Sequence, residues 1–314
     1  TDIEATIKEE GEIVVSAKLF LDIVRRLPEE IVFIETDERM VTYIACGKVN
    51  YQIVGMSSVE YPDLPSFEQT DRITLNAKIL RDMIRQTVYA VSENTAKPIY
   101  TGSLYEIEDG VFKIIAIDGY RMAIRSENVD SESKNRFVVP GKTQHEVLKL
   151  LTDDEENTEI IIGQRHITFK IKNYRIISRL IEGTFIEYKS AIPKETKTEV
   201  VINTRTIIDA VERMSLLNND RIQSPVRCIF SDDEIKLSCT SAVGRANDVI
   251  SVPIIGESVE IGFNNRYLLD ALKNADTDEI KLILNGSLTA MIVKPVKGDS
   301  YLSIVVPMRL ANEN

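Results

Sequence analysis

The sequence predicts an α+β fold built from repeated units of one strand, one helix and three further strands. A strand-to-helix pattern recurs five times, with equivalent positions at Ser16, Asn76, Pro140, Asn203 and Asn264, which are spaced by 60, 64, 63 and 61 residues. In each copy, alternating apolar residues give way to apolar residues at helical spacing. Three segments rich in β-branched and aromatic residues then follow. A fixed period of this kind indicates a repeated structural unit.

Each predicted helix begins directly after the equivalent position. The side chains of Ser16, Asn76, Asn203 and Asn264 can accept hydrogen bonds from the free amides of a first helical turn, which makes them good N-caps. We therefore expect helices at residues 17–27, 77–91, 141–151, 204–217 and 265–273.

The strands that follow each helix are expected to pair as antiparallel hairpins. Asp109-Gly110 is a strong hairpin turn signal, and Asp118-Gly119 introduces the next strand. Proline- or aromatic-bearing connectors at residues 60–65 and 185–188 end the first and third units, so units pair into domains with limits 1–69, 70–195 and 196–314. The strands are expected at 31–35, 40–46, 51–54, 103–108, 111–117, 159–162, 167–171, 175–181, 227–230, 235–239, 249–252, 280–284, 290–293 and 301–306.

Composition indicates a globular protein with ample core material, because 43% of residues are apolar, 28% are charged and no low-complexity run occurs. No apolar run approaches the length of a membrane span, and the first eleven residues are acidic and polar, unlike a signal peptide. We expect a cytoplasmic protein. Its three cysteines, Cys46, Cys228 and Cys239, are too few and too irregularly spaced for a disulfide framework or a metal site, so we interpret them as buried thiols.

Two charges repeat with the helices. A base lies two residues after each cap position and an acid lies six after it. The formal charge of -11 argues against indiscriminate coating of nucleic acid but permits one segregated basic face. One interpretation is a solvated helix face with a weak pair four residues apart. The other is that five helices present a base to one shared polyanion. The bases are Lys18, Lys78, Lys142, Arg205 and Arg266, and the acids are Asp22, Asp82, Glu146, Asp209 and Asp270.

The sequence predicts no catalytic site, metal or cofactor. The phosphate-cradling, serine-nucleophile and zinc-protease motifs are absent. His145 and His166 have no ligand-spaced companion, and the acid pairs 153–154 and 232–233 fall at turns. Three functions compete: a clamp on DNA, a peptide-binding scaffold without DNA, and a hydrolase with surface acids. The repeated base favours the first, and the lack of a nucleophile with a base disfavours the third.

Several motifs, collinear along the whole chain, resemble the bacterial sliding clamp family, the beta subunit of DNA polymerase III. The resemblance implies a processivity factor with three domains of two units each, closed head to tail into a dimeric ring. Helices would line the hole around duplex DNA, with antiparallel sheets outside, and the protein would be nucleoid-associated. Five units instead of six lead us to expect that the first half of domain one is absent. The motifs are Glu60-Tyr61-Pro62-Asp63-Leu64, Thr101-Gly102, Asp118-Gly119-Tyr120-Arg121, Ile261-Gly262-Phe263-Asn264 and Val305-Val306-Pro307-Met308-Arg309-Leu310.

The resemblance implies three kinds of site. Sequence-independent phosphate contacts would come from the five repeated bases, helped by Arg25, Arg81 and Arg85. A dimer edge would place Lys48, Tyr51 and Ile53 against Leu216 and Leu217 of the other subunit. The alternative for Leu216 and Leu217 is that they form an ordinary helix-end core.

The third site is a hydrophobic pocket between the last two domains, where the replicative polymerase, clamp loader and repair polymerases would insert a short peptide. The chain departs from the family at Phe185-Ile186-Glu187-Tyr188, where members read aromatic-Pro-Asp-Tyr. The alternative is that Val305, Val306 and Met308 only close the last sheet. The pocket residues implied are Tyr100, Ile117, Gly119, Tyr120, Arg121, Met122, Ile186, Ala191, Ile304, Val305, Val306, Pro307, Met308, Arg309 and Leu310, with Asn264 and Tyr267 at the rim.

Overall fold

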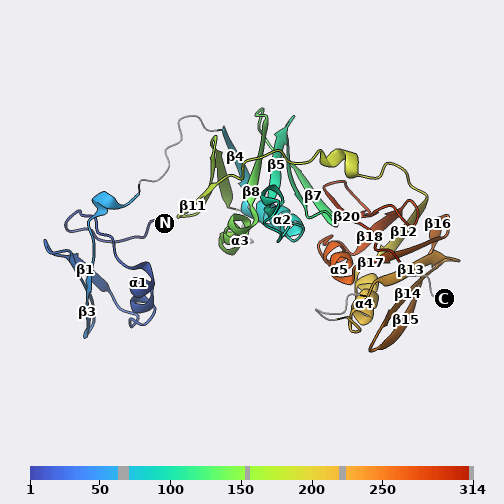
Figure 1. Cartoon of the computed structure of the whole chain (residues 1–314). Coiled ribbons are helices and arrows are strands. Elements are labelled where there is room, and N and C mark those ends of the chain that lie inside the picture. Colours follow the sequence, from blue (N-terminus) through green and yellow to red (C-terminus); the bar gives the residue numbers. More distant parts are fainter. Residues whose placement is uncertain (63–70, 153–155, 219–223, 311–314) are drawn as a thin grey trace. The chain divides into compact units, whose positions relative to one another are not determined.

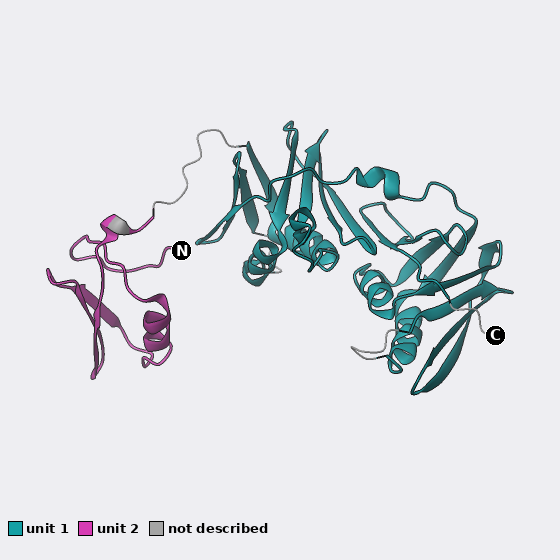
Figure 2. Cartoon of the chain, viewed as in Figure 1, with its two compact units in different colours: residues 1, 68–314 teal, residues 2–67 magenta. Residues whose placement is uncertain are grey.

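The computed structural model describes residues 1–62, 71–152, 156–218 and 224–310 (Figure 1). The chain divides into two compact units (Figure 2): the small unit, residues 2–67, and the large unit, residues 1 and 68–314. Residues 63–65 of the predicted connector and the acid pair 153–154 lie outside the described residues. No helix in the described ranges is long and apolar enough to cross a membrane.

The small unit contains one helix and one three-stranded antiparallel sheet. Helix α1 (Ala17–Val24) is followed by strands β1 (Val32–Thr36), β2 (Val41–Cys46) and β3 (Val49–Val54), in the order β1-β2-β3, and then by the 3-10 turn η1 (Ser58–Glu60). Val14 forms an isolated bridge with Met56. The core is small, with Ile23, Ile44 and Ile53 at its centre.

The large unit contains the other four repeats. Its first half comprises β4 (Asp71–Asn76), α2 (Ala77–Val88), η2 (Pro98–Thr101), β5 (Gly102–Glu108), β6 (Val111–Ile117), β7 (Arg121–Asn128), β8 (Asn135–Pro140), α3 (Gly141–Leu150), β9 (Asn157–Ile162), β10 (His166–Ile171) and β11 (Tyr174–Arg179). Its second half comprises η3 (Tyr188–Ala191), β12 (Thr198–Asn203), α4 (Thr204–Ser215), β13 (Val226–Ser231), β14 (Glu234–Ser241), β15 (Gly244–Ser251), β16 (Ile254–Gly256), β17 (Val259–Phe263), α5 (Asn265–Lys273), β18 (Glu279–Leu284), β19 (Met291–Pro295) and β20 (Tyr301–Val305).

Three antiparallel sheets organise the large unit, in the orders β11-β10-β9-β4, β15-β14-β13-β17 and β16-β12-β18-β19-β20-β7-β6-β5-β8. The nine-stranded sheet runs across the predicted boundary at residue 195, because β20 pairs with β7. Helices α2, α3, α4 and α5 lie along one side of the unit (Figure 1), with α2 against α3 and α4 against α5. The predicted α+β architecture is therefore confirmed, while the domain limits stay predictions.

Strands of neighbouring repeats pair with one another in a regular way. In the large unit, the first strand after each helix pairs with the leading strand of the neighbouring repeat: β5 with β8, β9 with β4, β13 with β17, and β18 with β12. In the small unit β1 pairs, among the described residues, with β2 alone, and its five residues are all exposed. An unpaired strand edge of this kind is a template for another strand.

The caps predicted from the sequence are confirmed. Asn76 Oδ1 accepts from the amides of Lys78 and Ile79 at 2.9 and 3.4 Å. Asn203 Oδ1 accepts from the amide of Thr206 at 3.0 Å. Ser16 and Asn264 cap α1 and α5 in the same way, while Pro140 offers no side-chain acceptor and α3 begins without one.

The ends of α3 and α4 were predicted one and two residues too late, and those of α1 and α2 three residues too late, at 27 and 91 instead of 24 and 88. The segments beyond both ends continue as tighter turns, in which Leu27 and Val91 donate to the carbonyls three residues earlier. Apolar spacing persists through such turns, so periodicity alone does not mark the true end. The short strand β16 was not predicted, whereas α5 and β6 have the limits expected from the sequence.

Three large regions of buried apolar side chains and one small region hold these elements. One lies beneath α4 and α5, one beneath α2 and α3, one in the small unit, and one spans β5, β6, β7, β19, β20 and the η3 segment. Cys46, Cys228 and Cys239 are all buried free thiols, as the sequence predicts. Burial raises the pKa of the Cys228 thiol to about 12.

Candidate functional site

The helix N-termini share an unusual charge arrangement. The first turns of α1, α2, α3, α4 and α5 contain no acidic residue. An acidic side chain at this position would stabilise a helix through its interaction with the helix dipole. Each has an exposed base there instead, which opposes the dipole and has a local cost. Because all five helices carry this locally unfavourable base, its presence indicates a functional requirement. We call these residues the first-turn bases: Lys18, Lys78, Lys142, Arg205 and Arg266.

The expected pairing between each first-turn base and the acid four residues on occurs in α4 alone among the described residues. There Arg205 Nε lies 2.8 Å from Asp209 Oδ1. In the other helices the acid pairs elsewhere: Asp22 with Arg26 at 3.7 Å, Asp82 with Arg85 at 3.4 Å, Glu146 with Lys149 at 2.8 Å, and Asp270 with Arg121.

Lys18, Lys78 and Lys142 form no ion pair within the described part of the chain. Their ammonium groups are thus available to an external anion. The simpler interpretation, a solvated helix face with an internal pair, holds for α4 only.

The three helper arginines differ in exposure. Arg25 is exposed, whereas Arg81 and Arg85 are half-buried on α2. Arg85 is engaged by Asp82 and by Asp276 of the segment after α5. The guanidinium of Arg85 therefore holds α2 to the second half of the large unit, and it is a weaker candidate for phosphate than Arg25.

A second candidate surface lies where β7, α5 and the chain end meet. The rings of Tyr120 and Tyr267 stack with centroids 5.7 Å apart and an interplanar angle of 19°. The amide of Val306 donates to Tyr120 O at 2.8 Å, and the amide of Met308 donates to Gly262 O at 2.8 Å. We call this region, formed by Tyr120, Tyr267, Val306, Pro307 and Met308, the tyrosine surface.

The tyrosine surface has the apolar and polar mixture that a peptide anchor needs. Tyr120 is 60% exposed and Val306 is 40% exposed, so both offer side-chain area to a partner. Gly119 and Arg309 are also exposed, and Leu310 packs against Gly262. Asn264 Oδ1 is engaged in capping α5, where it accepts from the amides of Arg266 and Tyr267 at 3.0 and 3.2 Å.

Arg121 lies beneath the tyrosine surface and is only 6% exposed. Its Nε donates to Asp118 Oδ2 at 2.9 Å and its Nη1 donates to Asp270. Its guanidinium carbon lies 4.6 Å from the ring centre of Tyr267 and 5.4 Å from that of Tyr89. The Arg121 side chain therefore supports the surface and is not part of its exposed lining.

Sequence reasoning missed Tyr89 and the pairing of Arg121 with Asp270. Burial raises the pKa of Tyr89 to about 12, and burial together with the charge of Asp118 raises the pKa of Tyr267. Tyr89 lies at the end of α2, and no local sequence pattern indicates that its ring contacts the guanidinium of Arg121. Only the folded structure shows this contact. The sequence identified Asp270 as one of the repeated acids, but the repeat pattern did not predict that Asp270 pairs with Arg121.

Other residues predicted for the pocket lie inside the protein. Met122, Ile304 and Val305 are 3%, 3% and 0% exposed, because β7 and β20 form adjacent strands in the middle of the nine-stranded sheet. For Val305 this burial favours the sheet-closing role that the sequence left open, and Met122 and Ile304 are likewise core residues with little area to offer a peptide. Tyr100 and Ile117 are partly buried against the same apolar region, whereas Ile186 and Ala191 are exposed.

Comparison with known proteins places the whole chain in one family. Three family models match it in order: the N-terminal, central and C-terminal domains of the DNA polymerase III beta subunit, over residues 1–65, 74–187 and 189–309. The beta sliding clamp of Halalkalibacterium halodurans is 34% identical over 310 residues, which cover 96% of this chain and 82% of that protein. The chain belongs to the DNA polymerase III beta subunit family. It is a sliding clamp by fold and a non-catalytic processivity factor of a DNA polymerase.

Solved sliding clamps have the same fold. The crystal structure of the clamp from Bacillus subtilis matches with a TM-score of 0.94 and 32% identity, covering 98% of this chain and 82% of that one. A clamp from Pseudomonas aeruginosa bound to griselimycin matches with a TM-score of 0.90 and 26% identity, covering 96% and 82%. The N-terminal-domain match over residues 1–65 does not support the expectation that the first half of domain one is absent.

The residues predicted for the dimer edge of this sliding clamp have mixed exposure. Lys48 and Tyr51 are exposed on the β2–β3 hairpin. Ile53 is 6% exposed because its side chain enters the core of the small unit, so it is a core residue and offers little area to a partner. Leu216 is 82% exposed, whereas Leu217 packs partly against the core beneath α4 and α5.

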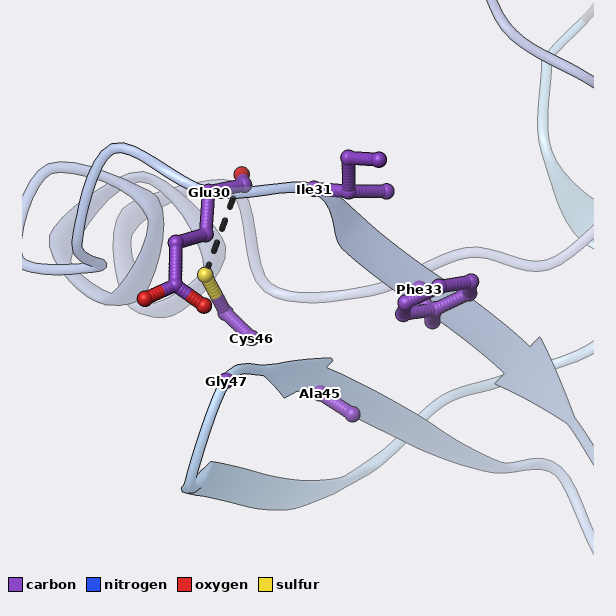
Figure 3. Close-up of a pocket in the computed structure, with 6 residues that line it drawn as sticks. All are labelled: Glu30, Ile31, Phe33, Ala45, Cys46 and Gly47. Carbon is purple, nitrogen blue, oxygen red and sulfur yellow. Dashed lines mark hydrogen bonds between the residues drawn. The ribbon is translucent and has the colours of Figure 1, made fainter.

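A pocket also occurs in the small unit of the sliding clamp, at the edge strand β1 (Figure 3). Its lining is mainly apolar, and the Cys46 thiol lies 3.9 Å from the Glu30 carbonyl oxygen. It offers one carboxylate and no convergent acid, base and nucleophile. Among the described residues, no group of three or more His, Cys, Asp and Glu side chains could hold a metal ion. The lining residues are Glu30, Ile31, Phe33, Ala45, Cys46 and Gly47.

Proposed function

We propose that this sliding clamp encircles duplex DNA as one subunit of a head-to-tail dimeric ring and slides on it in the bacterial cytoplasm, at the nucleoid. The observation that carries the proposal is the base in the first turn of every helix, where no acid occurs. Peptide amides and a cation at a helix N-terminus both attract phosphate. Such contacts ignore base sequence, and sliding requires this.

The proposed ring needs a subunit contact, for which Leu216 is the best-exposed apolar candidate, with Lys48 and Tyr51 facing it from a second copy. Light scattering tests the ring, with an expected mass twice the 35.5 kDa of one chain. Leu216→Asp is expected to give the monomer mass. Leu288→Asp is the matched control, because Leu288 is 83% exposed and lies outside the proposed edge. A monomer for the unaltered chain, or a dimer for the Leu216 variant, contradicts the proposed closure.

We further propose that the tyrosine surface is the docking site for short apolar peptides of the replicative polymerase, clamp loader and repair polymerases. Exposed aromatic rings beside Val306 and Met308 support this role. Gly119, Ile186, Ala191, Arg309 and Leu310 would border the docked peptide.

Griselimycin, which the clamp from Pseudomonas aeruginosa binds, is a suitable probe of the tyrosine surface. Calorimetric titration with griselimycin tests the site. Val306→Asp is expected to abolish binding, because a carboxylate would be desolvated against apolar ligand area. Val201→Asp on β12 is the matched control, since Val201 is 38% exposed and Val306 is 40% exposed. Equal binding by both variants would place the ligand elsewhere.

A further inference from the structure

The helices α4 and α5 are equivalent in the repeat, yet their ion pairs differ. In α4, Arg205 Nε lies 2.8 Å from Asp209 Oδ1, so the first-turn base is partly neutralised by its own helix. In α5 the equivalent acid, Asp270, bonds to Arg121 of the β6–β7 turn instead. Arg266, the first-turn base of α5, therefore does not pair with the acid of its own helix. Its Nη2 lies 3.6 Å from Glu93 Oε1 instead, and both side chains are exposed.

Arg121 is held by groups from three elements. Asp118 Oδ2 accepts from its Nε at 2.9 Å, and Asp118 Oδ1 accepts from the Arg121 amide at 3.0 Å. The rings of Tyr89 on α2 and Tyr267 on α5 lie on the guanidinium, within the range of cation–π attraction. The side chain is 6% exposed, so it has little freedom to move unless one of these neighbours moves.

Tyr267 is the neighbour that a ligand can reach. It is half-buried, and its outer contact is the stacked ring of Tyr120, which is 60% exposed. A ligand side chain that inserts between these two rings would have to displace one of them. Displacement of Tyr267 removes the nearer of the two rings on Arg121 and weakens the hold of Arg121 on Asp270.

We propose that the Arg121–Asp270 ion pair couples the tyrosine surface to the DNA-facing side of α5. Without ligand, Arg121 occupies Asp270, and Arg266 keeps only its exposed pair with Glu93, which phosphate can replace. With a ligand that shifts Tyr267, Asp270 is released and pairs with Arg266 four residues earlier, as Asp209 pairs with Arg205 in α4. Ligand binding at the tyrosine surface thereby lowers the affinity of the protein for DNA. Arg121 acts here as a positioning residue, and the inference rests on the proposed function of both surfaces.

Coupling of this kind is reciprocal, so DNA and the ligand at the tyrosine surface lower each other's affinity by the same factor. The test measures the anisotropy of a short labelled duplex at low salt, with the unaltered chain, in the absence and presence of saturating griselimycin. We expect a rise in Kd of about fivefold, at the lower end of measured couplings. The reverse titration, griselimycin with and without saturating duplex, is expected to give the same factor.

Two matched variants identify the path of the coupling. Arg266→Gln removes the base that Asp270 would neutralise, so griselimycin is expected to leave the duplex Kd of this variant unchanged. Arg205→Gln removes the equivalent base of α4, so it is expected to weaken duplex binding while the fivefold effect of griselimycin persists. Asp270→Asn is expected to bind duplex about as tightly as the unaltered chain without ligand, and its duplex Kd is expected to stay unchanged when griselimycin is added.

Three results separate the possible failures. If the unaltered chain binds duplex and griselimycin independently, the coupling is wrong, but both proposed binding surfaces remain supported. If Arg266→Gln keeps the griselimycin effect, the route through Asp270 is wrong. If the chain binds neither duplex nor griselimycin, the proposed function fails and the coupling fails with it.

Discussion

Replacing Asn264 separates two roles that its position suggests, helix cap and rim of the peptide site. In the structure its side-chain oxygen accepts from the amides of Arg266 and Tyr267 at 3.0 and 3.2 Å, which leaves that oxygen engaged in capping. Asn264→Ala deprives two first-turn amides of their acceptor. Loss of an N-cap costs about 1 kcal/mol, within a range of about 0.5–2 kcal/mol. We expect this loss in the free energy of unfolding of the second half of the large unit.

The repeat supplies a matched control in Asn203, which caps α4 by accepting from the amide of Thr206 at 3.0 Å. Asn203→Ala is expected to cost a similar amount. Only Asn264→Ala should also weaken griselimycin binding, because α5 carries Tyr267 and α4 contributes nothing to the tyrosine surface. Asn264→Asp is expected to restore both properties, since aspartate is an equally good N-cap.

Urea unfolding followed by circular dichroism measures the stability change, and hydrogen exchange of the first-turn amides of α5 locates it. A capping role requires faster exchange at Arg266 and Tyr267 in Asn264→Ala and recovery in Asn264→Asp. If Asn264→Ala is as stable as the unaltered chain, the cap contributes nothing. If Asn264→Asp restores stability and leaves griselimycin binding weak, the amide group itself contacts the ligand.

Two further predictions concern carboxylates in the large unit. The hydrogen bond from Lys170, at 2.7 Å, lowers the pKa of Glu159 below 4.5. Glu159→Gln should therefore reduce the free energy of unfolding at pH 7, and the difference should vanish as pH falls below 4.5 through the lowered pKa, in urea titrations at each pH. Tyr188 donates to the buried Glu106 at 2.8 Å, so Tyr188→Phe should cost about 1–3 kcal/mol in the same assay at pH 7. A pH-independent Glu159 difference, or a neutral Tyr188→Phe, would show that these bonds contribute nothing.

Local signals predicted the repeating part of the fold. The caps at Asn76, Asn203 and Asn264 were readable because one side-chain oxygen and its neighbouring amides suffice to begin a helix. Strand positions followed from alternation and turn residues such as Asp109-Gly110, whose left-handed conformation the structure shows. The helix ends at α1 and α2 were less accurate, since apolar spacing continues through the turns beyond them.

Long-range contacts could not be predicted in this way. The pairing of β7 with β20 joins strands from both halves of the large unit into one nine-stranded sheet, and no local pattern specifies that register. The same pairing buries Met122 and Ile304, which the resemblance had assigned to the peptide site. Arg121 was assigned there too, but the contact of its guanidinium with Asp270 makes it a buried support.

The central claim, that the first-turn bases contact DNA phosphate, is tested most directly by the salt dependence of duplex binding. The slope of log K against log salt falls by about 0.9 for each phosphate contact that is lost. A variant with glutamine at Lys78, Lys142, Arg205 and Arg266 is expected to bind weakly, with a slope shallower by about 3 to 4. A control variant with glutamine at four exposed bases outside the helices, Lys97, Lys194, Arg245 and Lys297, is expected to keep most of the slope of the unaltered chain. Equal losses in the two variants, or an unchanged slope in the first, would contradict the claim.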